Sequence, residues 1–174
     1  MLFYFDNIYS IQEIPIMEIK FKDRFDLMVK LLIKNEDKLK ELYELYAQLD
    51  TNNSQFWLDI AAEESKHARL LENLHTAYTK ENLYINTNVN FNMETVRNNI
   101  DYIEKCIAVC KEKDIPLKYL YDSALKFENS VIENEQFSIF DLNIQQADNI
   151  ISVLKEETQK HIEQIRFNVN KMLK

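Results

Sequence analysis

The sequence predicts an all-α protein, an antiparallel four-helix bundle with a long crossover that carries an accessory helix. The 174 residues include no glycine and only two prolines, whereas a sheet-rich chain of this length would need glycine in its tight turns. Four long segments place apolar residues three and four positions apart, as on the buried face of a packed helix. A polar, asparagine-rich segment separates the first two of these segments from the last two.

The first two helices are expected over residues 22–49 and 54–79. The buried seams would contain Phe25, Val29, Leu32, Glu36, Leu39, Tyr43 and Tyr46 in the first helix, and Trp57, Ile60, Glu64, His67, Leu71, Leu74 and Tyr78 in the second. The polar break between them is short, so the two helices should be antiparallel neighbours. Asn53 or Ser54 can cap the second helix.

The crossover begins with the polar run KENLYINTNVNFN, which has no helical stripe. An accessory helix should follow it, capped by Asn90 or Asn92 and ending near residue 113. Because proline is tolerated in a first helical turn, the third bundle helix should run from Pro116 to about residue 140. The last helix is expected over residues 144–172. Residues 22–174 would form one domain, preceded by an N-terminal extension over residues 1–21.

The composition limits the classes of partner. A formal net charge of −8 argues against nucleic acid and against an anionic membrane surface. No apolar run is long enough to span a bilayer and no basic leader is seen, so we expect a cytoplasmic protein. Cys106 and Cys110 lie four apart on the accessory helix, where two buried thiols are expected.

Polar residues interrupt the apolar seams at matching depths. They are Glu36 in the first helix, Glu64 and His67 in the second, Glu128 in the third and His161 in the fourth. Burying an unpaired carboxylate costs several kcal/mol, and no seam position of these helices holds lysine or arginine. A bound cation is the simplest counter-charge. Carboxylate with imidazole is a ligand set for iron or manganese, with zinc also possible.

The spacing of these residues predicts a site for two metal ions in which one of the two Glu-x-x-His pairs, here called the irregular arm, is incomplete. A dinuclear carboxylate site takes a glutamate from each of two helices and a Glu-x-x-His pair from each of the other two. Glu64 and His67 form one such pair, but Thr158 stands three residues before His161. Glu157 is the nearest glutamate and a candidate ligand, although the charged run KEETQK favours a surface position.

Residues 23–171 resemble the rubrerythrin group of the ferritin-like superfamily. The segments that carry the resemblance are KNEDKLKELYELYAQL, AAEESKHARLLENL, ALKFENSVIENEQF and VLKEETQKHIEQI. The resemblance implies a ferritin-like bundle that holds two irons, with Glu36, Glu64, His67, Glu128 and His161 as ligands and Tyr43 beside them. It also implies peroxide reduction or iron oxidation, with peroxide, dioxygen or ferrous iron as the substrate. The family's rubredoxin-like tail is missing, so an external electron donor protein is expected. We also expect a homodimer.

Two other functions fit the same sequence. The bundle can hold a mononuclear or degenerate site and act as a structural or interaction protein. A substrate-oxidising di-iron hydroxylase is a further possibility, which would need a substrate channel.

Overall fold

The structure is a computed structural model that describes residues 16–80, 93–112, 115–133 and 145–172. These ranges contain five α-helices, one short 3-10 helix and no strand. The elements are α1 (Ile16–Leu49), η1 (Thr51–Asn53), α2 (Ser54–Thr79), α3 (Met93–Cys110), α4 (Leu117–Glu133) and α5 (Gln145–Met172). The prediction of an all-α helical bundle is therefore confirmed for the described part of the chain.

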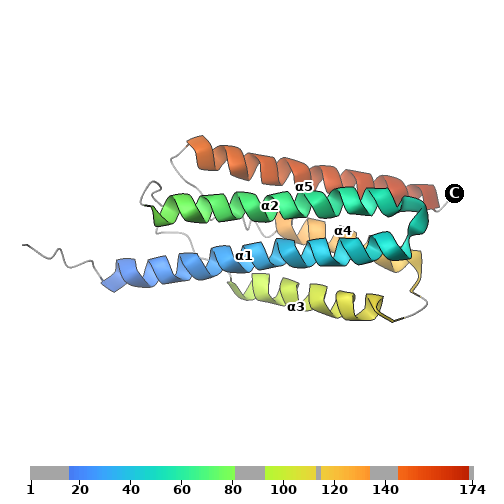
Figure 1. Ribbon diagram of the computed structural model, residues 1–174, viewed down its shortest axis with the longest axis horizontal. Helices are drawn as coiled ribbons and strands as arrows, with labels where there is room; N and C mark the ends of the chain where they lie inside the picture. The colour runs from blue at the N-terminus through green and yellow to red at the C-terminus, as the bar shows by residue number, and fades with distance from the viewer. Residues whose placement is uncertain (1–15, 81–92, 113–114, 134–144, 173–174) are drawn as a thin grey trace, which may run out of the picture.

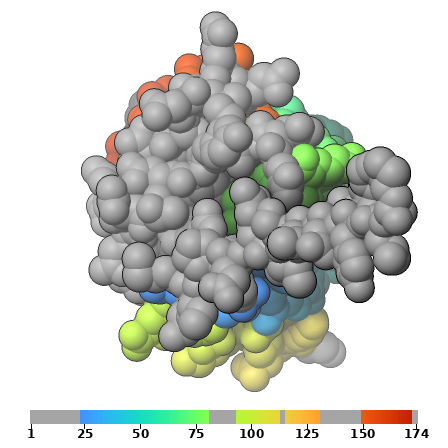
Figure 2. All heavy atoms as spheres, turned by 90° about the vertical axis from the view of Figure 1, so that its left-hand side faces the viewer, coloured from blue at the N-terminus to red at the C-terminus, as the bar shows by residue number. Residues whose placement is uncertain are grey.

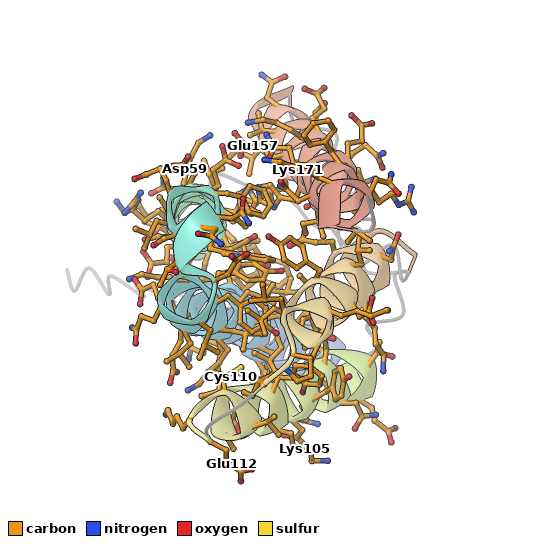
Figure 3. The ribbon with its side chains drawn as sticks, turned by 90° about the vertical axis from the view of Figure 1, so that its right-hand side faces the viewer. Asp59, Lys105, Cys110, Glu112, Glu157 and Lys171 are labelled. Carbon is orange, nitrogen blue, oxygen red and sulfur yellow. The ribbon has the colours of Figure 1, made fainter. Side chains whose placement is uncertain are left out.

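Helices α1, α2, α4 and α5 surround a common interior, and α3 lies outside them against α1 and α4 (Figure 3). Helix α2 runs antiparallel to α1, and α3 then runs back along the length of the bundle (Figure 1). As a result α4 has the same direction as α2, and α5 returns antiparallel to α4. Figure 2 shows the end of the bundle at which α3 begins, next to α1.

The helix boundaries follow the predicted ones with a few differences. Helix α2 begins and ends as predicted, and α3 confirms an accessory helix in the crossover. Helix α1 begins at Ile16, so part of the expected N-terminal extension is helical. Residues 134–140 of the predicted third helix lie outside the described residues. The predicted side-chain cap by Asn53 is wrong: its amide donates to both carboxylate oxygens of Asp50, at 3.1 and 3.2 Å.

The core consists of two apolar clusters with a polar layer between them. One cluster contains Phe25, Met28, Val29, Leu32, Leu71, Leu74, Val96, Ile100, Ile151 and Leu154. The other contains most of the buried aromatic residues of the described part: Tyr43, Tyr46, Trp57, Tyr121 and Phe127. Along α1, Glu36 lies between Leu32 of the first cluster and Leu39 of the second, so apolar side chains close the polar layer at both ends.

Two further expectations concern the accessory helix and membrane segments. Cys106 and Cys110 are free, buried thiols, as predicted. Among the described helices, none combines the length and the apolar character that a bilayer crossing would need.

Candidate metal centre

The five polar seam residues meet in the interior of the bundle. Glu36 comes from α1, Glu64 and His67 from α2, Glu128 from α4 and His161 from α5, and none is more than 3% exposed. They form two groups whose ligand atoms lie within 4.8 Å of one another. Glu36, Glu64 and His67 form the first, and Glu64, Glu128 and His161 form the second. Both groups therefore share Glu64.

The two oxygens of Glu64 face different histidines. Oε2 lies 2.9 Å from Nδ1 of His67, and Oε1 lies 3.2 Å from Nδ1 of His161. Glu36 Oε2 approaches His67 Nδ1 at 3.9 Å, and Glu128 Oε2 approaches His161 Nδ1 at 3.4 Å. The imidazole centroids are 5.8 Å apart. Each histidine thus directs Nδ1 toward a pair of carboxylates.

The outer nitrogen of each histidine contacts a glutamate of the opposite helix. His67 Nε2 lies 2.9 Å from Glu157 Oε2 on α5, and His161 Nε2 lies 2.5 Å from Glu63 Oε2 on α2. Lys66 pairs with Glu157, which Figure 3 labels, and Lys160 pairs with Glu63. A carboxylate on the far nitrogen fixes the ring orientation and tautomer of a metal-binding histidine.

These crossed contacts reveal a short internal repeat that the sequence analysis missed. Residues 63–67 read Glu-Glu-Ser-Lys-His, and residues 157–161 read Glu-Thr-Gln-Lys-His. Glu63 and Glu157 hold equivalent positions, four residues before a histidine. The pattern Glu-x-x-Lys-His was the signal that would have found Glu63. The same alignment pairs Thr158 with Glu64.

The structure places Glu157 outside both ligand groups, because its contact is to the outer nitrogen of His67. Thr158 is buried and donates its hydroxyl to the backbone carbonyl of Leu154 at 2.8 Å. Within the described part of the chain, no hydrogen bond joins Thr158 to His161, whose Nε2 instead contacts Glu63. Tyr43 donates to Glu128 Oε1 at 2.6 Å, which leaves Oε2 of Glu128 facing His161.

Two buried atoms at the centre make no hydrogen bond: Oε1 of Glu64 and Nδ1 of His161. Among the described residues, no lysine or arginine lies within ion-pair distance of Glu36, Glu64 or Glu128. Glu64 Oε1 and His161 Nδ1 face one another at 3.2 Å, so His161 is the counter-charge of that Glu64 oxygen. Three buried carboxylates with two histidines as their only counter-charges among the described residues still cost a folded protein several kcal/mol. Oxygen and imidazole donors at this spacing fit a metal ion in each group, with Glu64 between the two positions.

Without a metal, protons balance the buried charges. Burial raises the pKa of Glu36 well above its usual range, and the Glu64 charge raises it further. Burial and Glu64 likewise raise the pKa of Glu128. Burial opposes protonation of His161, but the carboxylates of Glu128 and Glu64 outweigh it and raise its pKa to about 11. Burial would also raise the pKa of Glu64, yet His161 and His67 hold it below its usual range.

Metal binding should therefore release protons and strengthen with increasing pH. A metal ion competes with the protons on His161, His67, Glu36 and Glu128, all of which have a raised pKa. Raising the pH lowers the concentration of the competing proton, so the zinc affinity should rise between about pH 6 and pH 8. Isothermal titration calorimetry in buffers of different ionisation enthalpy measures the proton count. An affinity that falls with pH, or binding without proton release, would contradict the assignment.

Replacing an outer carboxylate should weaken metal binding without touching a ligand. In Glu157→Gln, His67 Nε2 loses its charged acceptor, and the zinc affinity should fall by about 10- to 100-fold. Competition with a chromophoric chelator measures the change. Glu156→Gln, one residue away on the exposed face, is the matched control and should leave the affinity unchanged. If the two substitutions changed the zinc affinity equally, the contact between Glu157 and His67 Nε2 would have no role in metal binding.

Comparison of the chain with family models, curated proteins and solved structures finds no match.

Proposed function

We propose that this protein is a rubrerythrin-like member of the ferritin-like superfamily. Its Glu/His centre would bind two metal ions, and we propose iron for both. Its activity would be peroxide reduction or ferrous iron oxidation. The observation that supports this most is Glu64, a buried carboxylate shared by two Glu/His groups on four helices. A carboxylate shared between two nitrogen and oxygen donor sets suits a pair of metal ions in a helical bundle.

The connectivity of the bundle supports the same assignment. Helices α2 and α4 run in the same direction and are joined by a crossover that contains α3 (Figure 1). A bundle with one long crossover is the arrangement of ferritin-like folds, in which metal sites are built from facing helices.

The inner residues would divide between two metal positions. Glu36 and His67 would hold one ion, Glu128 and His161 the other, and Glu64 would give one oxygen to each. The ions would supply redox chemistry and an open position for peroxide or dioxygen. Manganese fits the same donors. Zinc fits them too but is not redox-active, so a zinc-loaded centre would not support this chemistry.

The surrounding residues would prepare the centre for this role. Glu157 and Glu63 would accept the Nε2 protons of His67 and His161, so that each Nδ1, which faces the inner carboxylates, could bind an ion once its proton is released. Tyr43 orients Glu128 through its hydroxyl. The two apolar clusters keep bulk water away from the polar layer. Electrons would come from a separate donor protein.

Thr158 favours a second candidate function. A complete site of this kind has four inner carboxylates, but Thr158 occupies the position equivalent to Glu64 and leaves three. A bundle with a single occupied metal position, or with none, would act as a structural or interaction protein instead. The stoichiometry of iron binding separates the two functions.

Iron loading tests the proposed function directly. Metal-free protein titrated with ferrous iron under anaerobic conditions should bind two ions per chain, and added peroxide should then produce ferric absorption. Glu64→Gln should weaken both positions, because each of them uses this carboxylate. Glu72→Gln, on the exposed face of α2, is the matched control. If no iron binds above background and the melting temperature is unchanged by iron, the metal function is wrong.

Restoring the fourth carboxylate tests the irregular arm. Thr158→Glu should strengthen binding of the iron ion that binds less tightly, because it adds a negative charge to balance the two positive ions. We expect an increase in affinity of about tenfold, which is about 1.4 kcal/mol, or more. Thr158→Val removes the hydroxyl without adding a charge and should leave the affinity unchanged. Binding constants come from the same anaerobic titration. An unchanged affinity in Thr158→Glu would mean that the arm is not deficient.

A further inference from the structure

Asn35 is a buried asparagine next to the candidate metal centre. It precedes Glu36 on α1 and is 1% exposed. Its Oδ1 accepts a hydrogen bond from Asn99 Nδ2 of α3 at 2.8 Å. Its own amino group carries two hydrogens, yet Nδ2 makes no hydrogen bond. A buried donor without an acceptor lowers the stability of a folded protein, so this amino group needs an explanation.

The amino group of Asn35 belongs to the surroundings of Glu36. Burial and the Glu64 carboxylate raise the pKa of Glu36 well above its usual range, whereas the Asn35 amide lowers it. An amide has this effect when its N–H groups are directed toward a carboxylate. The Asn35 amino group is therefore directed toward Glu36, although the two do not form a hydrogen bond in the metal-free protein.

Glu128 and both histidines of the centre already have an outer partner. Tyr43 donates to Glu128 Oε1 at 2.6 Å, and each histidine has a glutamate at its outer nitrogen. Glu36 differs, because its approach to His67 Nδ1 at 3.9 Å is too long for a hydrogen bond. Carboxylates that bind metal ions are usually held by hydrogen bonds from outer residues. Asn35 is placed to hold Glu36 as Tyr43 holds Glu128.

A role in helix alignment does not explain the free amino group. Buried asparagines can fix the register of two helices, and the bond between Asn35 and Asn99 joins α1 to α3. The same two helices are also joined by Lys34 and Lys38, which pair with Glu104 of α3 at 3.2 and 4.0 Å. Alignment uses the oxygen of Asn35 and gains nothing from an amino group without an acceptor.

We propose that Asn35 is a positioning residue for the metal position beside Glu36 and His67. Its amino group donates to the Glu36 carboxylate and holds it in the orientation that binds an ion. Asn99 occupies the oxygen of the Asn35 amide, which keeps the amino group turned to Glu36. The accessory helix α3 thereby takes part in the metal centre. This inference rests on the proposed function, because it needs a metal ion at that position.

Zinc titration of the full chain tests the positioning role. Asn35→Leu removes the donor at a similar side-chain size, so the zinc affinity beside Glu36 should fall by about 10- to 100-fold. The affinity beside Glu128 should not change. Isothermal titration calorimetry measures the two binding steps, and anomalous diffraction at one zinc ion per chain shows which position fills first. Unchanged affinities in Asn35→Leu would contradict the inference.

Asn129→Leu is the matched control for these measurements. Asn129 is a half-buried asparagine that also adjoins an inner glutamate, Glu128, but its amide donates to the backbone carbonyl of Leu125 at 2.6 Å. Its replacement should leave both zinc affinities unchanged. A loss equal to that in Asn35→Leu would mean that any such substitution weakens the centre, and the positioning role would be wrong.

Asn99→Leu separates positioning from helix packing. It breaks the bond between the two asparagines but leaves the Asn35 amino group in place, and water can replace the half-buried Asn99 side chain. The zinc affinity should therefore fall less than in Asn35→Leu. Equal losses in the two variants would mean that the effect comes from the packing of α1 against α3, which would overturn the positioning role.

A crystal structure of the unmodified protein with zinc gives a second measurement that does not depend on the folding of variants. Asn35 Nδ2 should lie within about 3.2 Å of an oxygen of Glu36. If zinc occupies both positions and this contact is absent, the inference is wrong and the proposed function stands. If zinc binds nowhere in the centre, or only beside Glu128, the two-ion function fails and the positioning role fails with it.

Discussion

The structure depends on the burial of three carboxylates at one depth of a helical bundle whose described residues bring no lysine or arginine to them. Among the described residues, Glu36, Glu64 and Glu128 have only His67 and His161 as charged partners, and one oxygen of Glu64 has no hydrogen bond. Each buried carboxylate costs several kcal/mol unless a counter-charge is present. In the metal-free protein, bound protons neutralise part of this negative charge. Metal ions would neutralise more of it.

The same constraint explains how α2 and α5 are held to one another. Each helix gives a histidine to the centre and a glutamate to the other helix's histidine, so Glu63 and Glu157 fix the relative register of the two helices. A slide of one helix along the other would break both contacts together. Lys66 and Lys160 neutralise the outer carboxylates at the surface, which confines the unbalanced charge to the inner ones.

Periodicity predicted most of the fold and the inner residues of the site. Glu36, Glu64, His67, Glu128 and His161 follow the helical repeat of their apolar neighbours, so their burial at one depth could be predicted from spacing alone. Glu63 could not, because it lies beside the seam and its partner His161 is distant in sequence. Asp50 reads as a turn residue, and only folding brings Trp57 and Tyr121 to donate hydrogen bonds to its carboxylate. The start of α1 at Ile16 was missed although Pro15 precedes it in the sequence, a signal of the same kind as Pro116.

The central claim is that Glu64 lies between two metal positions. Anomalous diffraction from crystals grown with zinc or ferrous iron measures this most directly, because it locates the ions without reference to activity. We predict two anomalous peaks, one beside Glu36 and His67 and one beside Glu128 and His161, with Glu64 contacting both. A single peak would support the mononuclear bundle, and peaks only at surface carboxylates such as Glu63 or Glu157 would contradict the claim.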